Sequence, residues 1–270
     1  SWQVALAAPK FDDQAFGFPI RSAGLRARQS GACSSLLITM RRLVGPLLLL
    51  LVRKGAPVIM GAFVTSIDMN SGAPTFGTPE AAQITLGAGQ LARRMGLPYR
   101  SAGSFCGSKL PDAQAAYETA NTLNIGLLAG VNFMLHTAGW LEGGLAMGYE
   151  KFIMDCDQAS MISILLSGMD MSENNQAMSA FEEIGPGQHF LGADHTLKNF
   201  ETAFYRSTIA DNNSYEQWTS EGGLDAAQRA TKIWKHMLSE YQAPELDVSI
   251  DDALKAFMVE KKASFADRDY

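Results

Sequence analysis

The side chains able to do chemistry gather in three loops of this chain, at residues 65–74, 101–109 and 137–144. In and near these loops the sequence places aromatic rings and carboxylates: Phe76, Tyr99, Phe105, Trp140 and Tyr149, with Asp68, Glu80, Asp112 and Glu142. Ring faces combined with a few acids suit a cationic ligand such as a quaternary ammonium, at about 0.5–2 kcal/mol for each good cation–π contact. Each residue alone is explained more simply as core or as a helix cap, so only the whole set supports a cation site.

Three other kinds of site fit the sequence less well. Metal ligands usually come as pairs a few residues apart, and no such pair occurs among His136, His189, His195, Cys106 and Cys156. The glycine-containing stretches 139–144 and 185–187 match neither a dinucleotide-binding nor a phosphate-binding loop. A Cys106 nucleophile activated by His136 stays open as a second enzyme hypothesis, because the two residues lie one β/α unit apart.

Short apolar runs precede each of the three loops, and helix-like segments follow them. Strand, loop and helix in repeated order predict an α/β fold with a parallel sheet. We expect parallel strands near residues 58–63, 99–102 and 133–137, adjacent and in sequence order. Loops after the carboxyl ends of such strands form active sites, so the fold should bring the candidate residues together.

The composition argues against several classes of partner. The 270 residues carry a formal net charge of −6 and no Lys/Arg-rich patch, which argues against nucleic acid. The apolar run at residues 43–52 is about half the length that a bilayer requires and is broken by Gly45-Pro46, so we expect no membrane partner. Three widely spaced cysteines are typical of a reducing compartment, and with no evident secretory signal we expect a cytoplasmic protein.

Longer motifs resemble those of one protein family. They are GAPVIMG at 55–61, DMNSGAPTFGTPE at 68–80, PDAQAAY at 111–117, HTAGWLEGG at 136–144 and GPGQHFLGADHT at 185–196. Together they resemble the trimethylamine methyltransferase family, and the neighbourhoods of Tyr205-Arg206 and Trp234-Lys235 are similar as well. The resemblance runs from about Leu51 to the C-terminus.

The resemblance implies a (β/α)8 barrel, present here as an incomplete C-terminal part with extra C-terminal helices. Family members move a methyl group from a methylated amine to the cobalt of a separate corrinoid protein. The implied cofactor is therefore a corrinoid (cobalamin) carried by a partner protein, with none bound by this chain. The founding members carry pyrrolysine in the loop before residue 111, where this chain has an ordinary lysine, Lys109. This departure places the chain in the non-pyrrolysine branch and favours a quaternary amine such as glycine betaine as substrate.

Loop positions assign expected roles within the site. We expect Tyr99, Phe105 and Trp140 to bind the substrate through their ring faces. The expected catalytic set lies at the same rim of the barrel: His136, Glu142 and Lys109. Lys109 should face the barrel mouth, because it follows a strand by a short loop and precedes a helix. No metal ligand is assigned.

Residues 1–50 differ in character from residues 51–270, because they lack helical or strand periodicity and nothing in them resembles the family. We expect an irregular, possibly frame-shifted N-terminal segment, poorly packed over residues 1–29, ahead of a partial methyltransferase barrel domain. A barrel without its first strands has open edges. An inactive fragment, or a small-cation-binding protein without catalysis, therefore stays open beside the enzyme, as does a homo-oligomer.

Overall fold

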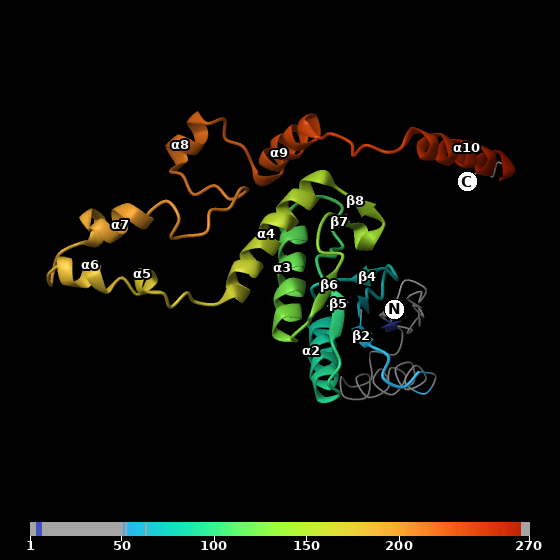
Figure 1. Ribbon diagram of the computed structural model, residues 1–270, viewed down its shortest axis with the longest axis horizontal. Helices are drawn as coiled ribbons and strands as arrows, with labels where there is room; N and C mark the ends of the chain where they lie inside the picture. Colours follow the sequence, from blue (N-terminus) through green and yellow to red (C-terminus); the bar gives the residue numbers. More distant parts are fainter. Residues whose placement is uncertain (1–3, 7–50, 52, 63, 266–270) are drawn as a thin grey trace. The chain divides into compact units, whose positions relative to one another are not determined.

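The computed structural model describes residues 4–6, 51, 53–62 and 64–265 (Figure 1). It divides into two compact units, residues 1–234 and 235–270. The first unit contains the sheet and the candidate site. The second contains α10 (Val248–Ser264), whose N-cap Asp247 accepts a hydrogen bond from the backbone N–H of Ser249. One turn of α10 carries an exposed ion pair between Asp251 and Lys255, with 2.5 Å between the oxygen and nitrogen.

A four-stranded sheet runs in the order β1 (Val4–Leu6), β2 (Val58–Ala62), β5 (Tyr99–Ala102) and β6 (Phe133–Leu135). β1 pairs antiparallel with β2, whereas β2 with β5 and β5 with β6 are parallel. The three parallel strands lie where the sequence predicted them, adjacent and in chain order, so that prediction is confirmed. Their carboxyl ends, and the loops that follow, lie at one edge of the sheet.

The strands alternate with helices, as the sequence predicted: α2 (Pro79–Arg94), α3 (Ala113–Leu128) and α4 (Tyr149–Ser167). Asp112 caps α3 by accepting a hydrogen bond from the Ala115 N–H. Thr78 occupies the N-cap position of α2, but its hydroxyl bonds the Ser66 hydroxyl at 2.9 Å instead of capping. The other elements are β3 (Ser66–Ile67), β4 (Pro74–Thr75), β7 (Trp140–Leu141), β8 (Ala146–Met147), α5 (Glu173–Gln176), α6 (Met178–Glu183), α7 (Asp194–Asn199), α8 (Tyr215–Ser220), α9 (Ala226–Glu240) and the 3₁₀ turns η2 (Glu142–Gly144) and η3 (Phe190–Gly192).

Helices α2 and α3 lie side by side on one face of the sheet and close the main core (Figure 1). This core joins strand residues to small helical residues: Met60, Ala62, Tyr99, Ala88, Ala92 and Ala129. Gly89 of α2 allows the close approach, because a Cβ atom added there would lie 2.2 Å from the backbone oxygen of Ala129.

Gly89 and Gly87 provide a matched pair of substitutions within α2. Gly89→Ala should destabilise the protein by about 1–3 kcal/mol, because the new methyl group meets backbone that must shift. Gly87→Ala should instead stabilise it by about 0.5–1 kcal/mol, because nothing lies within 4 Å of the added Cβ and alanine favours a helix. Urea unfolding measures both changes. Equal effects of the two substitutions would contradict this packing.

Two expectations reach beyond what the structure describes. The described residues hold a mixed α/β arrangement with a parallel sheet, and among them no closed eight-stranded barrel forms, so the barrel stays a prediction. Of the segment expected to be irregular, residues 1–29, all but Val4–Leu6 lie outside the described residues. Those three residues form β1, which the sequence did not predict.

In the described part of the chain, no helix is both long and apolar enough to cross a bilayer.

Candidate active site

Four aromatic side chains meet beyond the carboxyl ends of β5 and β6. The rings of Phe105 and His136 have centroids 4.7 Å apart, and Trp140 lies 5.6 Å from Phe105 and 5.5 Å from His136. Phe76, which follows β4, stacks on Phe105 at 5.5 Å. Phe76 and Phe105 are buried, whereas His136 and Trp140 are only partly buried. We call these four residues the ring cluster. All four were named in the sequence analysis, and three of them, Phe105, His136 and Trp140, were given roles in the site there.

Strained backbone occurs in the ring cluster and next to it. His136 and Glu142 both adopt left-handed conformations, with φ of 56° and 48°, although neither is glycine. Such conformations cost of the order of 1–3 kcal/mol each and persist where the surrounding structure fixes them. Backbone hydrogen bonds fix both residues: the Ser104 N–H donates to the His136 carbonyl at 2.9 Å, and the Glu142 N–H donates to the Ser108 carbonyl at 2.8 Å.

A buried arginine lies close to the ring cluster. Arg100 of β5 is only 7% exposed, and its Nε atom has no hydrogen-bond partner among the residues that the structure describes. Neighbouring residues of a strand face opposite sides, and Tyr99 packs with α2 in the main core. Arg100 therefore lies on the other face of the sheet. Burial lowers the pKa of its guanidinium, but arginine stays charged in proteins.

The arginine affects the neighbouring histidine. Burial first, and then the positive charge of Arg100, lower the pKa of His136. The ring is therefore neutral at pH 7, and a neutral ring can contact a cation without repelling it. The arrangement joins aromatic faces to a nearby guanidinium whose Nε has no partner in the described part of the chain, which suits a ligand that carries both a positive and a negative group.

This proximity makes His136 a reporter of the Arg100 charge. Its pKa, measured by NMR titration, should lie below the usual range of histidine and rise in Arg100→Gln. Arg94→Gln, which removes an exposed charge from the last turn of α2, should leave it unchanged. Because the unfolded chain takes up the proton more readily, stability should fall as the pH drops below about 6.5. If the pKa of His136 is the same in Arg100→Gln as in Arg94→Gln, the charge of Arg100 does not act on the ring cluster.

The remaining residues predicted for the site lie elsewhere or at its edge. Tyr99 is a correction: it is 1% exposed, packs in the main core, and its hydroxyl lies 3.4 Å from the Thr85 carbonyl. It opens β5, so it lies in the sheet and not in the loop beyond it. Glu142 is exposed and opens η2, two residues after Trp140. Lys109 is exposed in the loop from β5 to α3, where its Nζ donates to the Gly107 carbonyl at 2.9 Å.

The structure gives Cys106 a different environment from that of a nucleophile. The thiol is fully buried and lies 3.3 Å from the Trp140 carbonyl, to which it donates. Burial raises the pKa of the Cys106 thiol, which keeps it protonated and unreactive. Activation by His136 is therefore not supported.

Among the described residues, no group of three or more His, Cys, Asp or Glu side chains is arranged to hold a metal ion.

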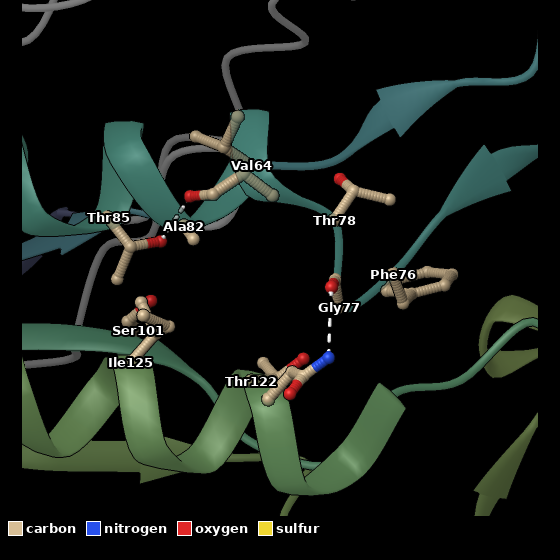
Figure 2. A pocket seen from close by; sticks show the side chains of 11 residues that line it. Val64, Phe76, Gly77, Thr78, Ala82, Thr85, Ser101, Thr122 and Ile125 are labelled. Carbon is tan, nitrogen blue, oxygen red and sulfur yellow. Dashed lines mark hydrogen bonds between the residues drawn. The ribbon is translucent and has the colours of Figure 1, made fainter. Parts of the chain in front are cut away.

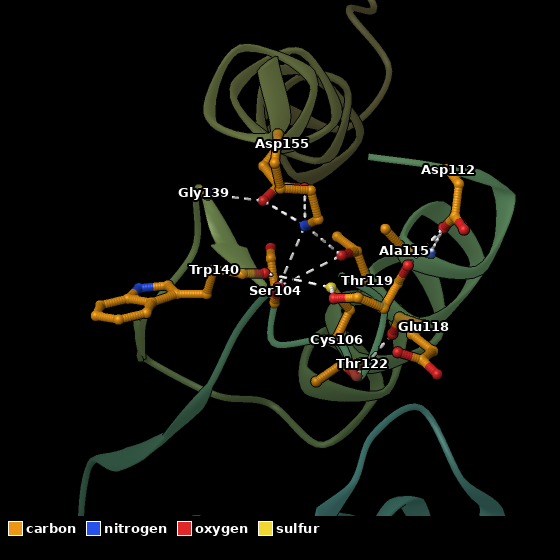
Figure 3. Close-up of polar contacts among 12 residues, drawn as sticks. Ser104, Cys106, Asp112, Ala115, Glu118, Thr119, Thr122, Gly139, Trp140 and Asp155 are labelled. Carbon is orange, nitrogen blue, oxygen red and sulfur yellow. Dashed lines mark hydrogen bonds and ion pairs between the residues drawn. The ribbon is translucent and has the colours of Figure 1, made fainter. Parts of the chain in front are cut away.

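Beneath the loops lies a buried ion pair that the sequence analysis missed (Figure 3). Lys151 and Asp155 of α4 are 1% and 3% exposed. Lys151 Nζ lies 2.6 Å from both carboxylate oxygens of Asp155 and donates to the Thr119 hydroxyl at 2.8 Å. The available signal was the four-residue spacing, which places both side chains on one face of α4.

A pocket between α2 and α3 is not the site (Figure 2). It has a volume of about 40 Å³, and its lining includes Thr85, Ser101, Thr122 and Ile125. None of its lining residues is charged, and Phe76 is the one member of the ring cluster among them. The pocket also lies on the helix-covered face of the sheet, as its lining shows.

Comparisons with known proteins identify the family of this chain. The model of the family described as trimethylamine methyltransferase (MTTB) matches residues 19–266. The chain belongs to the trimethylamine methyltransferase family. The match begins at residue 19, so the expectation that nothing ahead of Leu51 resembles the family is wrong for residues 19–50.

Relatives within the family carry two kinds of name. A glycine betaine methyltransferase of Desulfitobacterium hafniense (strain Y51) is 43% identical over 210 residues, which cover 78% of this chain and 44% of the relative. A trimethylamine methyltransferase MttB of D. hafniense (strain DSM 10664 / DCB-2) is 32% identical over 215 residues, 80% of this chain and 43% of the relative. The trimethylamine methyltransferase MttB of Methanosarcina barkeri is 30% identical over 225 residues, which cover 83% of this chain and 45% of the relative. The chain thus spans less than half the length of these family members.

Proposed function

We propose that this chain is part of a methyltransferase that takes a methyl group from a quaternary amine and passes it to the cobalt of a corrinoid protein. Family membership supports methyl transfer, and the ring cluster carries the choice of a quaternary amine. A quaternary nitrogen has no N–H to donate, so ring faces and through-space negative charge must recognise it. Phe105 and Trp140 provide the faces, neutral His136 extends them, and exposed Glu142 contributes the negative charge.

Arg100 supports a substrate that also carries a carboxylate. Among the residues that the structure describes, the buried Nε of Arg100 has no hydrogen-bond partner, and a ligand carboxylate would supply one. Charge-assisted hydrogen bonds from arginine to a carboxylate are among the strongest available. Glycine betaine joins a trimethylammonium group to a carboxylate and so fits both features. The relative that is 43% identical bears the name of this substrate.

In this proposal the residues of the chain bind and align, and they form no covalent bond with the substrate. The corrinoid of the partner protein would supply the cobalt nucleophile that accepts the methyl group. The ring cluster would hold the trimethylammonium group and exclude water from it. Arg100 would fix the carboxylate, so that one methyl group points out of the site. Lys109, in the exposed loop after β5, would lie at the rim where the partner docks.

Methyl transfer to free cob(I)alamin tests this function. The protein is mixed with cob(I)alamin and glycine betaine, choline, tetramethylammonium or trimethylamine, and formation of methylcobalamin is followed by absorbance. We expect the fastest transfer from glycine betaine and slower transfer from the amines without a carboxylate. Methyl transfer from trimethylamine alone would contradict the proposal.

A second candidate is a small-cation-binding protein without catalysis. The observation that favours it is that Cys106 is buried and has a raised pKa, so it is not an activated nucleophile, whereas the rings of Phe105 and Trp140 can bind a cation without any reaction. Binding of quaternary amines without methylcobalamin formation would select this candidate.

A further inference from the structure

The Lys151–Asp155 ion pair reaches the backbone of the two loops that carry Phe105 and Trp140 (Figure 3). Lys151 Nζ donates to the carbonyl oxygen of Ser104 at 3.3 Å, and Ser104 directly precedes the first of the two rings. Asp155 Oδ2 accepts a hydrogen bond of 2.9 Å from the N–H of Gly139, which directly precedes the indole. One ion pair on α4 therefore bonds to the residue next to each ring.

Stability alone does not explain an ion pair in this place. Both side chains are almost fully buried, and moving two charges out of water is costly. Apolar residues of similar volume often serve as well or better in stability. What apolar residues cannot provide is a pair of directed hydrogen bonds, one to a carbonyl and one to an N–H.

Helix α4 also has separate attachments to the rest of its unit. The Asp157 carboxylate accepts hydrogen bonds from the Tyr205 hydroxyl at 2.9 Å, the Ser207 hydroxyl at 2.6 Å and the Thr208 N–H at 2.9 Å. These contacts hold α4 against the segment that follows it. Asp157 therefore attaches α4 to that segment, while Lys151 and Asp155 form hydrogen bonds with the two loops.

We propose that Lys151 and Asp155 are positioning residues that set the spacing of Phe105 and Trp140, and with it the affinity of the site for a cation. The proposal rests on the proposed function in naming the ligand, but the placement of the rings can be measured without any ligand. The two ring centroids lie 5.6 Å apart. Cation–π attraction falls away beyond about 6 Å from a ring. A small displacement of either loop therefore removes one face from the ligand.

The test uses a double substitution that keeps volume and removes charge, Lys151→Met with Asp155→Leu. Its matched control is Lys255→Met with Asp251→Leu, which removes an exposed ion pair of the same spacing from α10. Each protein is measured for its urea unfolding midpoint, for its affinity for tetramethylammonium by calorimetry, and by ¹⁹F NMR with 5-fluorotryptophan. The Trp140 line is assigned by its loss in Trp140→Phe.

We expect the buried double variant to keep an unfolding midpoint near that of the wild type, to lose about tenfold or more in tetramethylammonium affinity, and to show a shifted or broadened Trp140 line. The control should change neither affinity nor line. Unchanged affinity and an unchanged line in the folded buried variant would overturn the proposal. If the double variant does not fold, Asp155→Asn, which preserves size, gives the same measurements with the same two outcomes. A changed line with no cation binding even in the wild type would leave the positioning role standing and remove the proposed function.

Discussion

Replacing Lys151 alone with methionine will lower the free energy of unfolding by about 3–5 kcal/mol, because it leaves the Asp155 carboxylate buried without its partner. The loss will depend on pH. Burial already raises the pKa of Asp155, and the nearby lysine is the main influence that lowers it. Without Lys151 the folded state will hold Asp155 protonated more strongly than the unfolded state does. Stability of the variant will therefore fall as the pH rises above about 4, towards the raised pKa.

Urea unfolding of Lys151→Met at pH 5 and pH 8 measures this effect. The matched control is Lys255→Met, which removes the lysine of an exposed pair with the same four-residue spacing. An exposed pair contributes only about 0–1 kcal/mol, so the control should change little. A loss as small as that of the control, or a loss that does not vary with pH, would mean that the buried pair is not ionic.

Arg100→Gln will remove most of the preference for glycine betaine over choline, the second large effect that the structure predicts. Choline has the same trimethylammonium group but a hydroxyl in place of the carboxylate. Losing a charge-assisted hydrogen bond to a buried arginine costs about 1.5–3 kcal/mol, or roughly tenfold to a hundredfold in affinity. The loss should fall on glycine betaine, because only that ligand has the anion.

Calorimetric titration of both ligands into the two proteins measures this ratio. Arg100→Lys keeps the charge without the forked donors and should retain part of the preference. Arg94→Gln removes an exposed arginine of the same unit and should retain all of it. An unchanged ratio of affinities in Arg100→Gln would show that the arginine does not contact the carboxylate.

Much of this arrangement could be predicted from the sequence, because it depends on local pattern. Apolar runs placed the three parallel strands, and loop position after the strand ends placed Phe105, His136 and Trp140 together. Both signals are local, since a buried strand and its following loop are contiguous in the chain. Loops that follow neighbouring parallel strands lie at the same edge of the sheet, so their residues come together even when the packing elsewhere differs.

The failures arose where the outcome depends on which way a side chain points. Tyr99 is next to Arg100, and a shift of one residue exchanges the two faces of a strand. Nothing in the local pattern favours one face over the other, so the pattern predicts the ring at the site and does not predict the arginine there. Lys151 and Asp155 were missed because charged residues four apart on a helix are usually solvent-exposed. Only the packing of α4 beneath the two loops gives that pair its role.

Affinity for glycine betaine compared with 3,3-dimethylbutanoate, in which an uncharged tert-butyl group replaces the trimethylammonium group, tests the central claim most directly. The two ligands share a carboxylate and a shape, and they differ only in the positive charge. If the ring cluster recognises a cation, the wild type will bind glycine betaine about tenfold more tightly, and Trp140→Ala will abolish that difference. Equal affinity of the wild type for both ligands, or a difference that survives Trp140→Ala, would contradict the account.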